Sequence, residues 1–172
     1  SDDLLELLGF YIAEGHAEDG YFMISCQEPE LQRRLERCLN NLGLTWRVRS
    51  NDDDYVVAWS LYARLLHRWC GATSREKRLP DFWPELSRAQ LARLLAAYYA
   101  GDGGVEHDAV SVTTASVQLA SQLAYALAHF GLWARVSRSV KRATNARHQG
   151  DLYYRIVVSG VEQLDRFSHQ IN

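Results

Sequence analysis

The chain repeats itself once, and this internal repeat restricts its possible folds more than any other feature. The stretch LLGFYIAEG at residues 7–15 reappears as LAAYYAGDG at residues 95–103, a shift of 88. The same shift aligns NLGLTWRV at 41–48 with HFGLWARV at 129–136. A single shift of 88 residues that aligns several segments indicates a tandem duplication. We therefore expect two halves that share one architecture.

The second copy is longer than the first. YVVAWS at 55–60 resembles YRIVVS at 154–159 at a shift of 99, so 11 residues have been gained, which we place around 141–151. The stretch GATSREKRLPDFWPEL between the copies carries two prolines that discourage a helix. These features predict a first half at 1–71, a joining segment at 72–87 and a second half at 88–172.

Hydrophobic periodicity and turn residues predict the same order of elements in each half, namely helix, hairpin, helix, hairpin, helix. Pro29 is placed to open one helix, and Ser87 with Gln90 forms a capping box before another. The fold class is therefore α+β, with two antiparallel sheets. In the first half we expect helices at about 3–14, 29–42 and 61–69, and strands at 21–25, 45–50 and 55–60.

Composition narrows the class of protein. The 172 residues are 47% hydrophobic, enough for a core, and the net charge of −2 gives no general case for nucleic-acid binding. Cys26, Cys38 and Cys70 form no CxxC pair, which argues against a disulfide framework and a structural zinc site. We see no membrane-spanning apolar run and no leader pattern, so we expect an intracellular protein, cytoplasmic or organellar.

Each repeated stretch ends in an acid followed by glycine. Small residues four apart, Gly9 with Ala13 and Ala97 with Gly101, would let two helix backbones approach closely. That packing would bring Glu14 and Asp102 side by side, where two carboxylates repel unless protonated or neutralised by divalent cations. The alternative is that both acids are solvated residues at helix ends; their recurrence after the small residues favours the metal site.

These stretches resemble the paired motifs of the LAGLIDADG homing endonucleases, and the resemblance covers nearly the whole chain. It differs from the named motif at Ile12 and Ala100, at Gly101 and at Glu14, where a glutamate replaces the catalytic aspartate of the first copy. The resemblance implies a monomeric, site-specific DNA endonuclease that hydrolyses both strands with Mg²⁺, for which Mn²⁺ would substitute. Glu14 and Asp102 would hold the metal, with the carbonyls of Ala13 and Gly101 as further ligands. Two four-stranded sheets would form a saddle over a long, asymmetric double-stranded DNA target.

Basic residues alternate with apolar ones along the expected DNA-facing strands. The alternative is an ordinary solvated sheet face, and Asp52, Asp53 and Asp54 at the first hairpin tip support it. The residues we expect to contact DNA are Arg47, Arg49, Arg135, Ser137, Arg138, Ser139, Lys141, Arg142, Arg147 and Arg155.

Lys77 lies in REKRLPDF, which resembles a Lys-x-hydrophobic-Pro stretch that often precedes the second motif in this family. The resemblance implies a role near the scissile phosphates, where a cation stabilises charge or orients the attacking water. The second half carries no obvious equivalent lysine. We interpret His16 and His107 as polar turn residues.

Two other functions stay open at the level of sequence. One is a DNA-binding regulator that keeps the fold without cleavage, and the other is an RNA-binding maturase. Both acids are retained, which favours the enzyme. The sequence also leaves open whether the chain derives from an intein or an intron, and which DNA sequence it would cut.

Overall fold

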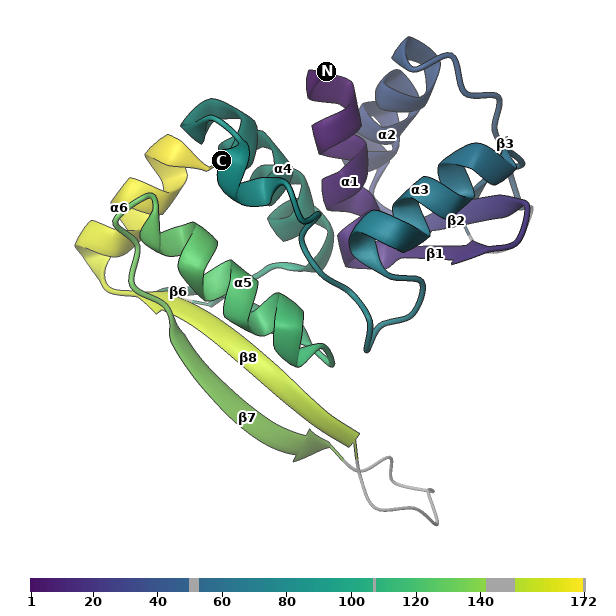
Figure 1. Ribbon diagram of the computed structural model, residues 1–172. Coiled ribbons are helices and arrows are strands. Elements are labelled where there is room, and N and C mark those ends of the chain that lie inside the picture. Colours follow the sequence, from purple (N-terminus) through teal and green to yellow (C-terminus); the bar gives the residue numbers. More distant parts are fainter. Residues whose placement is uncertain (50–52, 107, 142–150, 172) are drawn as a thin grey trace.

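A computed structural model (Figure 1) describes residues 1–49, 53–106, 108–141 and 151–171. The first half contains helices α1 (Asp2–Glu14), α2 (Pro29–Asn41) and α3 (Ser60–Cys70). Its strands are β1 (Gly15–Glu18), β2 (Tyr21–Ser25), β3 (Arg47–Val48) and β4 (Asp54–Val57). They form an antiparallel sheet in the order β1-β2-β4-β3.

The second half repeats this arrangement. Its helices are α4 (Arg88–Asp102), α5 (Val117–Ala128) and α6 (Val161–Gln170), and its strands are β5 (Gly104–Glu106), β6 (Ala109–Thr114), β7 (Arg135–Lys141) and β8 (Asp151–Ser159). The sheet order β5-β6-β8-β7 is equivalent to that of the first half. The expected α+β class, with two four-stranded antiparallel sheets, is therefore confirmed.

Local sequence signals account for the helix starts. The Ser87 hydroxyl accepts from the Gln90 N–H while the Gln90 side chain accepts from the Ser87 N–H, which completes the expected capping box. Pro29 occupies the start of α2, where its missing N–H costs no helical hydrogen bond. None of the described helices is long and apolar enough to cross a membrane.

Helices α1 and α4 lie side by side at the centre of the molecule and join the two halves (Figure 1). Both are buried on most sides, and leucines of both belong to one core that continues beneath each sheet. A Cβ placed on Gly101 would lie only 2.8 Å from the Ala13 Cβ, so the two backbones approach as closely as the small residues predicted.

The strands differ in length from the sequence prediction. Within the segment expected as a strand at 45–50, β3 comprises Arg47–Val48, and the strand expected at 55–60 ends at Val57. It ends there because the Trp59 N–H turns back to the Val57 carbonyl and Trp59 becomes the N-cap of α3. Strands β7 and β8 have 7 and 9 residues, against 2 and 4 in β3 and β4. The insertion expected around 141–151 lies largely outside the described residues.

The joining segment packs on the core. Leu79 is fully buried, Lys77 is 5% exposed, and a short 3₁₀ helix spans Trp83–Glu85. All three cysteines lie in the described part of the chain, where each is buried with a free thiol.

Candidate functional site

Two carboxylates mark the site, because α1 ends at Glu14 and α4 ends at Asp102. A glycine follows each acid for a steric reason. A Cβ on Gly15 would lie 2.5 Å from the Tyr11 carbonyl oxygen, and one on Gly103 would collide with the equivalent carbonyl of Tyr99. The chain can therefore leave each helix directly into β1 or β5, which places the acids where helix and sheet meet.

Glu14 and Asp102 line one cavity of about 290 Å³ together with Lys77. Burial, followed by the charge of Glu14, raises the pKa of Asp102 from 3.8 to about 6. Burial also raises the pKa of Glu14, against the opposing charge of Lys77. The charge of Glu14 therefore acts on Asp102, and a cation between the two acids would relieve their repulsion.

Lys77 reaches this cavity from the joining segment. Its ammonium donates to the Tyr11 carbonyl at 2.5 Å and lies 3.7 Å from the centroid of the Tyr11 ring. Burial lowers its pKa from 10.5 to about 7, although Cys70, Glu14 and Asp102 oppose this shift. A cation that lines the same cavity as both acids can stabilise negative charge that develops there.

The sequence reasoning missed the tyrosines that support these groups. The Tyr11 hydroxyl donates to the Gly71 carbonyl at 2.8 Å, which fixes the ring beneath Lys77. The Tyr98 hydroxyl donates to Asp102 Oδ2 at 3.2 Å. A signal was present, since aromatic residues precede the acid by three or four positions in both repeated stretches.

The donor set suits a hard divalent cation. Two carboxylates meet at helix ends whose last carbonyls lack a partner within the helix, and oxygen donors of this kind favour Mg²⁺ or Mn²⁺. The described residues contain no cluster of three or more His, Cys, Asp or Glu side chains that would bind a metal without other ligands. A metal held here would therefore need further oxygen ligands besides these two carboxylates.

The two sides of the acid pair are chemically unequal. A second cavity of about 340 Å³ is lined by Glu14 and Gly101, and also by Cys26, Gln27 and Glu28. No lysine lines it among the described residues, whereas Lys77 lines the first cavity. Among the described residues, a lysine is therefore placed to act on one side of the acid pair and not on the other.

Basic and hydroxyl side chains follow one face of the second sheet. Val136 lies opposite Ile156, which is fully buried, so Arg135, Ser137 and Ser139 point away from the core. Ser139 and Arg155 line a cavity of about 430 Å³ with Asp102, so this face of the sheet extends to one of the two site carboxylates. Arg155 is already paired there with Glu106 at 2.6 Å.

The other expected DNA contacts are distributed differently. Arg138 lies on the same strand face as Val136, opposite to that of Arg135. Arg47 lies opposite Val56 on the non-core face of the first sheet, and Arg49 is exposed just after β3. Lys141 ends β7, while Arg142 and Arg147 lie outside the described residues.

Two of the three hairpin aspartates have structural roles. Asp54 is buried and accepts a hydrogen bond from the Ser25 hydroxyl at 2.5 Å. Asp53 takes a positive φ of 52° and its carbonyl accepts from the Cys26 N–H. Asp52 and His107 lie outside the described residues, and His16 pairs with Glu18 at 3.2 Å.

Known proteins resemble this chain in sequence over different lengths. Residues 89–172 match the model of a LAGLIDADG-like domain. The chain is 33% identical over 181 residues to the replication factor C small subunit of Thermococcus kodakarensis, covering 99% of this chain and 19% of that protein. It is 29% identical over 183 residues to the protein of the same name from Methanocaldococcus jannaschii, covering 99% and 9%. A DNA polymerase of Thermococcus kodakarensis is 26% identical over 141 residues, covering 76% and 8%. The chain thus spans less than a fifth of each of these relatives.

Solved structures resemble the whole chain. Full-length DUF199/WhiA from Thermatoga maritima has a TM-score of 0.69 at 13% identity, covering 99% of this chain and 55% of that one. Mesophilic variants of the homing endonuclease I-DmoI have a TM-score of 0.69 at 11% identity, covering 99% and 94%. I-DmoI in complex with DNA and Mn has a TM-score of 0.64 at 12% identity, covering 99% and 96%. At these identities the likeness establishes the LAGLIDADG fold.

Proposed function

Since the chain has the LAGLIDADG fold, we propose that it is a site-specific endonuclease that hydrolyses both strands of a double-stranded DNA target. One observation carries this proposal: Glu14 and Asp102 line a single cavity, and the charge of Glu14 helps to raise the pKa of Asp102. Carboxylates in solvent at two helix ends would not be coupled in this way. The coupling is the arrangement that a cation-dependent hydrolase needs.

In this function Glu14 and Asp102 hold divalent metal, with the Ala13 and Gly101 carbonyls as further donors. Mg²⁺, or Mn²⁺ in its place, would supply Lewis-acid stabilisation of the phosphate and activation of the attacking water when bound. Lys77 lies on one side of the pair and stabilises charge that builds up on the phosphate there. The Tyr11 ring, held by the hydrogen bond from its hydroxyl to Gly71, packs against the Lys77 ammonium and fixes its position.

The open sheet faces supply the binding surface for the DNA. Arg135, Ser137 and Ser139 of the second sheet and Arg47 of the first lie on faces turned away from the core. Phosphate contacts by such arginines give affinity, and hydroxyl groups between them can read base edges. I-DmoI, which shares the fold, forms a complex with DNA in the presence of Mn.

A DNA-binding protein without cleavage is the second candidate. DUF199/WhiA, which unlike I-DmoI is not named as an endonuclease, matches the chain with the same TM-score as the I-DmoI variants. This observation favours the second candidate. The fold therefore does not decide between the two. The pair of acids does favour the enzyme.

We also propose that the chain functions as a module inserted into a longer protein, as inteins and their endonucleases are. The support is that related segments occur within proteins of different names, a replication factor C small subunit and a DNA polymerase, and make up only 19% and 8% of them. A segment shared by otherwise differently named proteins is expected of a mobile element.

The decisive experiment separates cleavage from binding. The protein is incubated with a randomised library of double-stranded DNA in Mg²⁺ to identify a target, which is then placed in a supercoiled plasmid. Glu14→Gln and Asp102→Asn remove charge and keep shape, so each variant should bind the target in Ca²⁺ and lose cleavage of at least one strand in Mg²⁺ by orders of magnitude. His16→Gln, in strand β1 two residues after Glu14 and outside the walls of that cavity, is the matched control and should cut normally.

Two outcomes would count against the enzyme. Linear plasmid formed by both acid variants at the wild-type rate would make these carboxylates structural. Tight binding by the wild-type protein with no cleavage in Mg²⁺ or Mn²⁺ would identify the DNA-binding protein instead.

A further inference from the structure

A groove that the proposed nuclease does not use runs along the side of α4. It consists of two cavities, of about 430 Å³ and 600 Å³, which share Arg34, Ala96 and Ile171 in their walls. Helices α2 and α6 form its other sides. We call this feature the α4–α6 groove.

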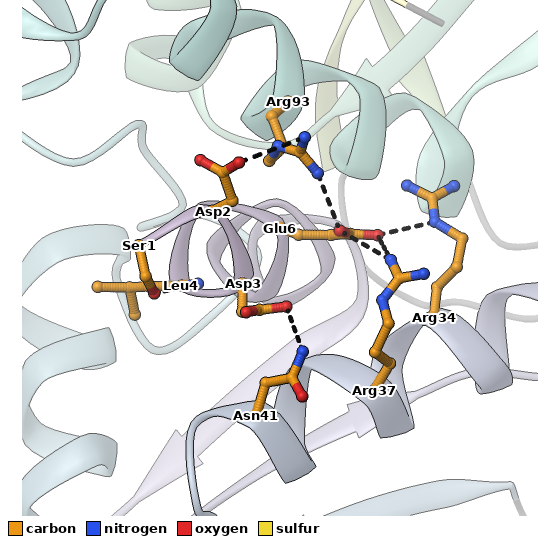
Figure 2. Close-up of polar contacts among 9 residues, drawn as sticks. All are labelled: Ser1, Asp2, Asp3, Leu4, Glu6, Arg34, Arg37, Asn41 and Arg93. Carbon is orange, nitrogen blue, oxygen red and sulfur yellow. Dashed lines mark hydrogen bonds and ion pairs between the residues drawn. The ribbon is translucent and has the colours of Figure 1, made fainter.

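One end of the groove is rich in arginine. Figure 2 shows Arg34, Arg37 and Arg93 converging on the buried carboxylate of Glu6, whose side chain is 3% exposed. The closest approaches are 2.8 Å from Arg34, 3.2 Å from Arg37 and 3.7 Å from Arg93. Because these arginines come from α2 and α4, the cluster joins the two halves of the chain.

Charge at this end exceeds what Glu6 can neutralise. Arg34, Arg37 and Arg93 line this cavity together with one carboxylate, that of Glu6, although the chain as a whole has a net charge of −2. Asp2 contacts Arg93 at 3.4 Å but its side chain is 65% exposed, so solvent weakens that pair. The arginine end is therefore complementary to an added carboxylate.

The other end is apolar and contains one unsatisfied hydroxyl. Tyr99 and Phe167 stack edge to face at 4.9 Å, and Val105 beside them is 85% exposed. Tyr99 is 7% exposed, and its hydroxyl has no hydrogen-bond partner among the described residues. A buried hydroxyl without a partner destabilises the free protein, so this site favours a ligand that offers an acceptor.

The first half shows what acceptor suits this hydroxyl. Tyr11 is the equivalent of Tyr99 in the repeat, and its hydroxyl donates to a peptide carbonyl, that of Gly71, in a segment that packs over the ring. The same geometry at Tyr99 needs a stretch of peptide backbone.

We propose that the α4–α6 groove binds an extended peptide segment of a partner protein that combines a large apolar side chain with acidic residues. The apolar side chain packs against the cavity wall formed by Tyr99 and Phe167, a backbone carbonyl accepts from Tyr99, and a carboxylate pairs with Arg34 and Arg37. Nucleic acid suits the groove less well, because its apolar end offers nothing to a phosphate. This proposal does not depend on nuclease activity.

A phage-displayed library of random heptapeptides tests the proposal directly. It is selected on the wild-type protein and on Ser168→Phe, in which a bulky side chain at an exposed position fills the apolar end. Asp165→Phe is the matched control, since Asp165 is an exposed residue of the same helix outside both cavity walls. We expect the wild-type protein and Asp165→Phe to enrich peptides with an aromatic or leucine residue next to Asp or Glu, at least tenfold over Ser168→Phe.

One enriched peptide is then synthesised with a fluorescent label, and its affinity is measured by anisotropy. Tyr99→Phe, which removes only the hydroxyl, should weaken binding about fivefold. Arg37→Ala should weaken it and make it less sensitive to salt, while Glu6 keeps Arg34 and Arg93 as partners.

Several results would contradict the binding of such a peptide in the α4–α6 groove. Equal enrichment on Ser168→Phe, or enriched peptides without acidic residues, would overturn the proposal, as would full affinity in Tyr99→Phe. Loss of affinity for duplex DNA in Arg37→Ala with no peptide selected would instead make the arginine end a nucleic-acid surface.

Discussion

Gly9 of α1 packs directly on Ala97 of α4, its own equivalent in the repeat. A Cβ on Gly9 would lie 2.6 Å from the Ala97 Cβ and 2.5 Å from the Leu94 carbonyl oxygen. Ala13 and Gly101, also equivalent to each other, meet in the same way. Equivalent residues that touch are expected around a twofold relationship between the halves, and this packing fixes how close the two acids below it can come.

The first prediction is that Gly9→Ala destabilises the protein. Helix propensity alone would favour alanine by about 1 kcal/mol. The clash with α4 opposes this, and overpacking of this kind typically costs about 1 to 3 kcal/mol. Thermal unfolding monitored by circular dichroism should show a lower Tm. Gly104→Ala is the control, because the nearest atom to its new Cβ lies 3.9 Å away. A higher Tm for Gly9→Ala would mean that the helices can separate at little cost.

The second prediction concerns the pH dependence of stability without metal. The pKa of Asp102 is about 6 in the folded protein against 3.8 for the ordinary group, so between these values the folded state retains a proton that the unfolded state has released. Stability contributed by this residue therefore falls as pH rises from about 4 to 6. Asp102→Asn should be more stable than wild type at pH 7, by about 1 to 2 kcal/mol. The advantage should disappear near pH 4 and shrink when Mg²⁺ is added. Urea unfolding across this range measures it, and a pH-independent difference would contradict it.

The third prediction concerns Lys77, whose shift has the opposite direction. Its pKa is about 7 when folded against 10.5 ordinarily, so between these values the unfolded state binds the extra proton and stability rises with pH. Lys77→Met keeps the bulk and removes the charge. Its stability relative to wild type should be greatest below pH 7 and should decline towards pH 10. Cleavage by this variant should fall at the same time. A variant that cuts at the wild-type rate would limit Lys77 to packing.

The fourth prediction compares two arginines on opposite faces of β7. Arg135 lies on the face turned away from the core and Arg138 lies on the other face. Arg135→Ala should weaken binding of the target duplex and reduce the slope of log affinity against log salt by roughly 0.9 for each phosphate that is no longer neutralised. Arg138→Ala should change neither quantity. Equal effects of the two substitutions would place the DNA elsewhere.

The central helix crossing was predictable from sequence because it depends on residue size and spacing. Gly9 and Ala13, repeated as Ala97 and Gly101, have few reasons to recur other than a close helix crossing. The position of the acids followed from the same pattern. Strand lengths were less predictable, because the end of β4 depends on where Trp59 begins to cap α3.

Contacts between segments far apart in the chain could not be predicted from the sequence pattern. Lys77 meets Tyr11 across 66 residues, and no periodicity connects them. The cluster at Glu6 was likewise missed, although it had a signal. Leu5, Leu7 and Leu8 surround Glu6 in the sequence and are buried, so an acid among them needs a cationic partner.

The unequal hairpins have a consequence for the DNA that the protein would recognise. At roughly 3.3 Å per residue, the 9 residues of β8 extend about 30 Å, whereas the 4 residues of β4 extend about 13 Å. The footprint of the second half on a duplex would therefore be the longer one. The two halves would therefore contact stretches of duplex of unequal length, which a palindromic site does not match. We expect base changes to be tolerated better in the flank that the first half contacts than in the flank that the second half contacts.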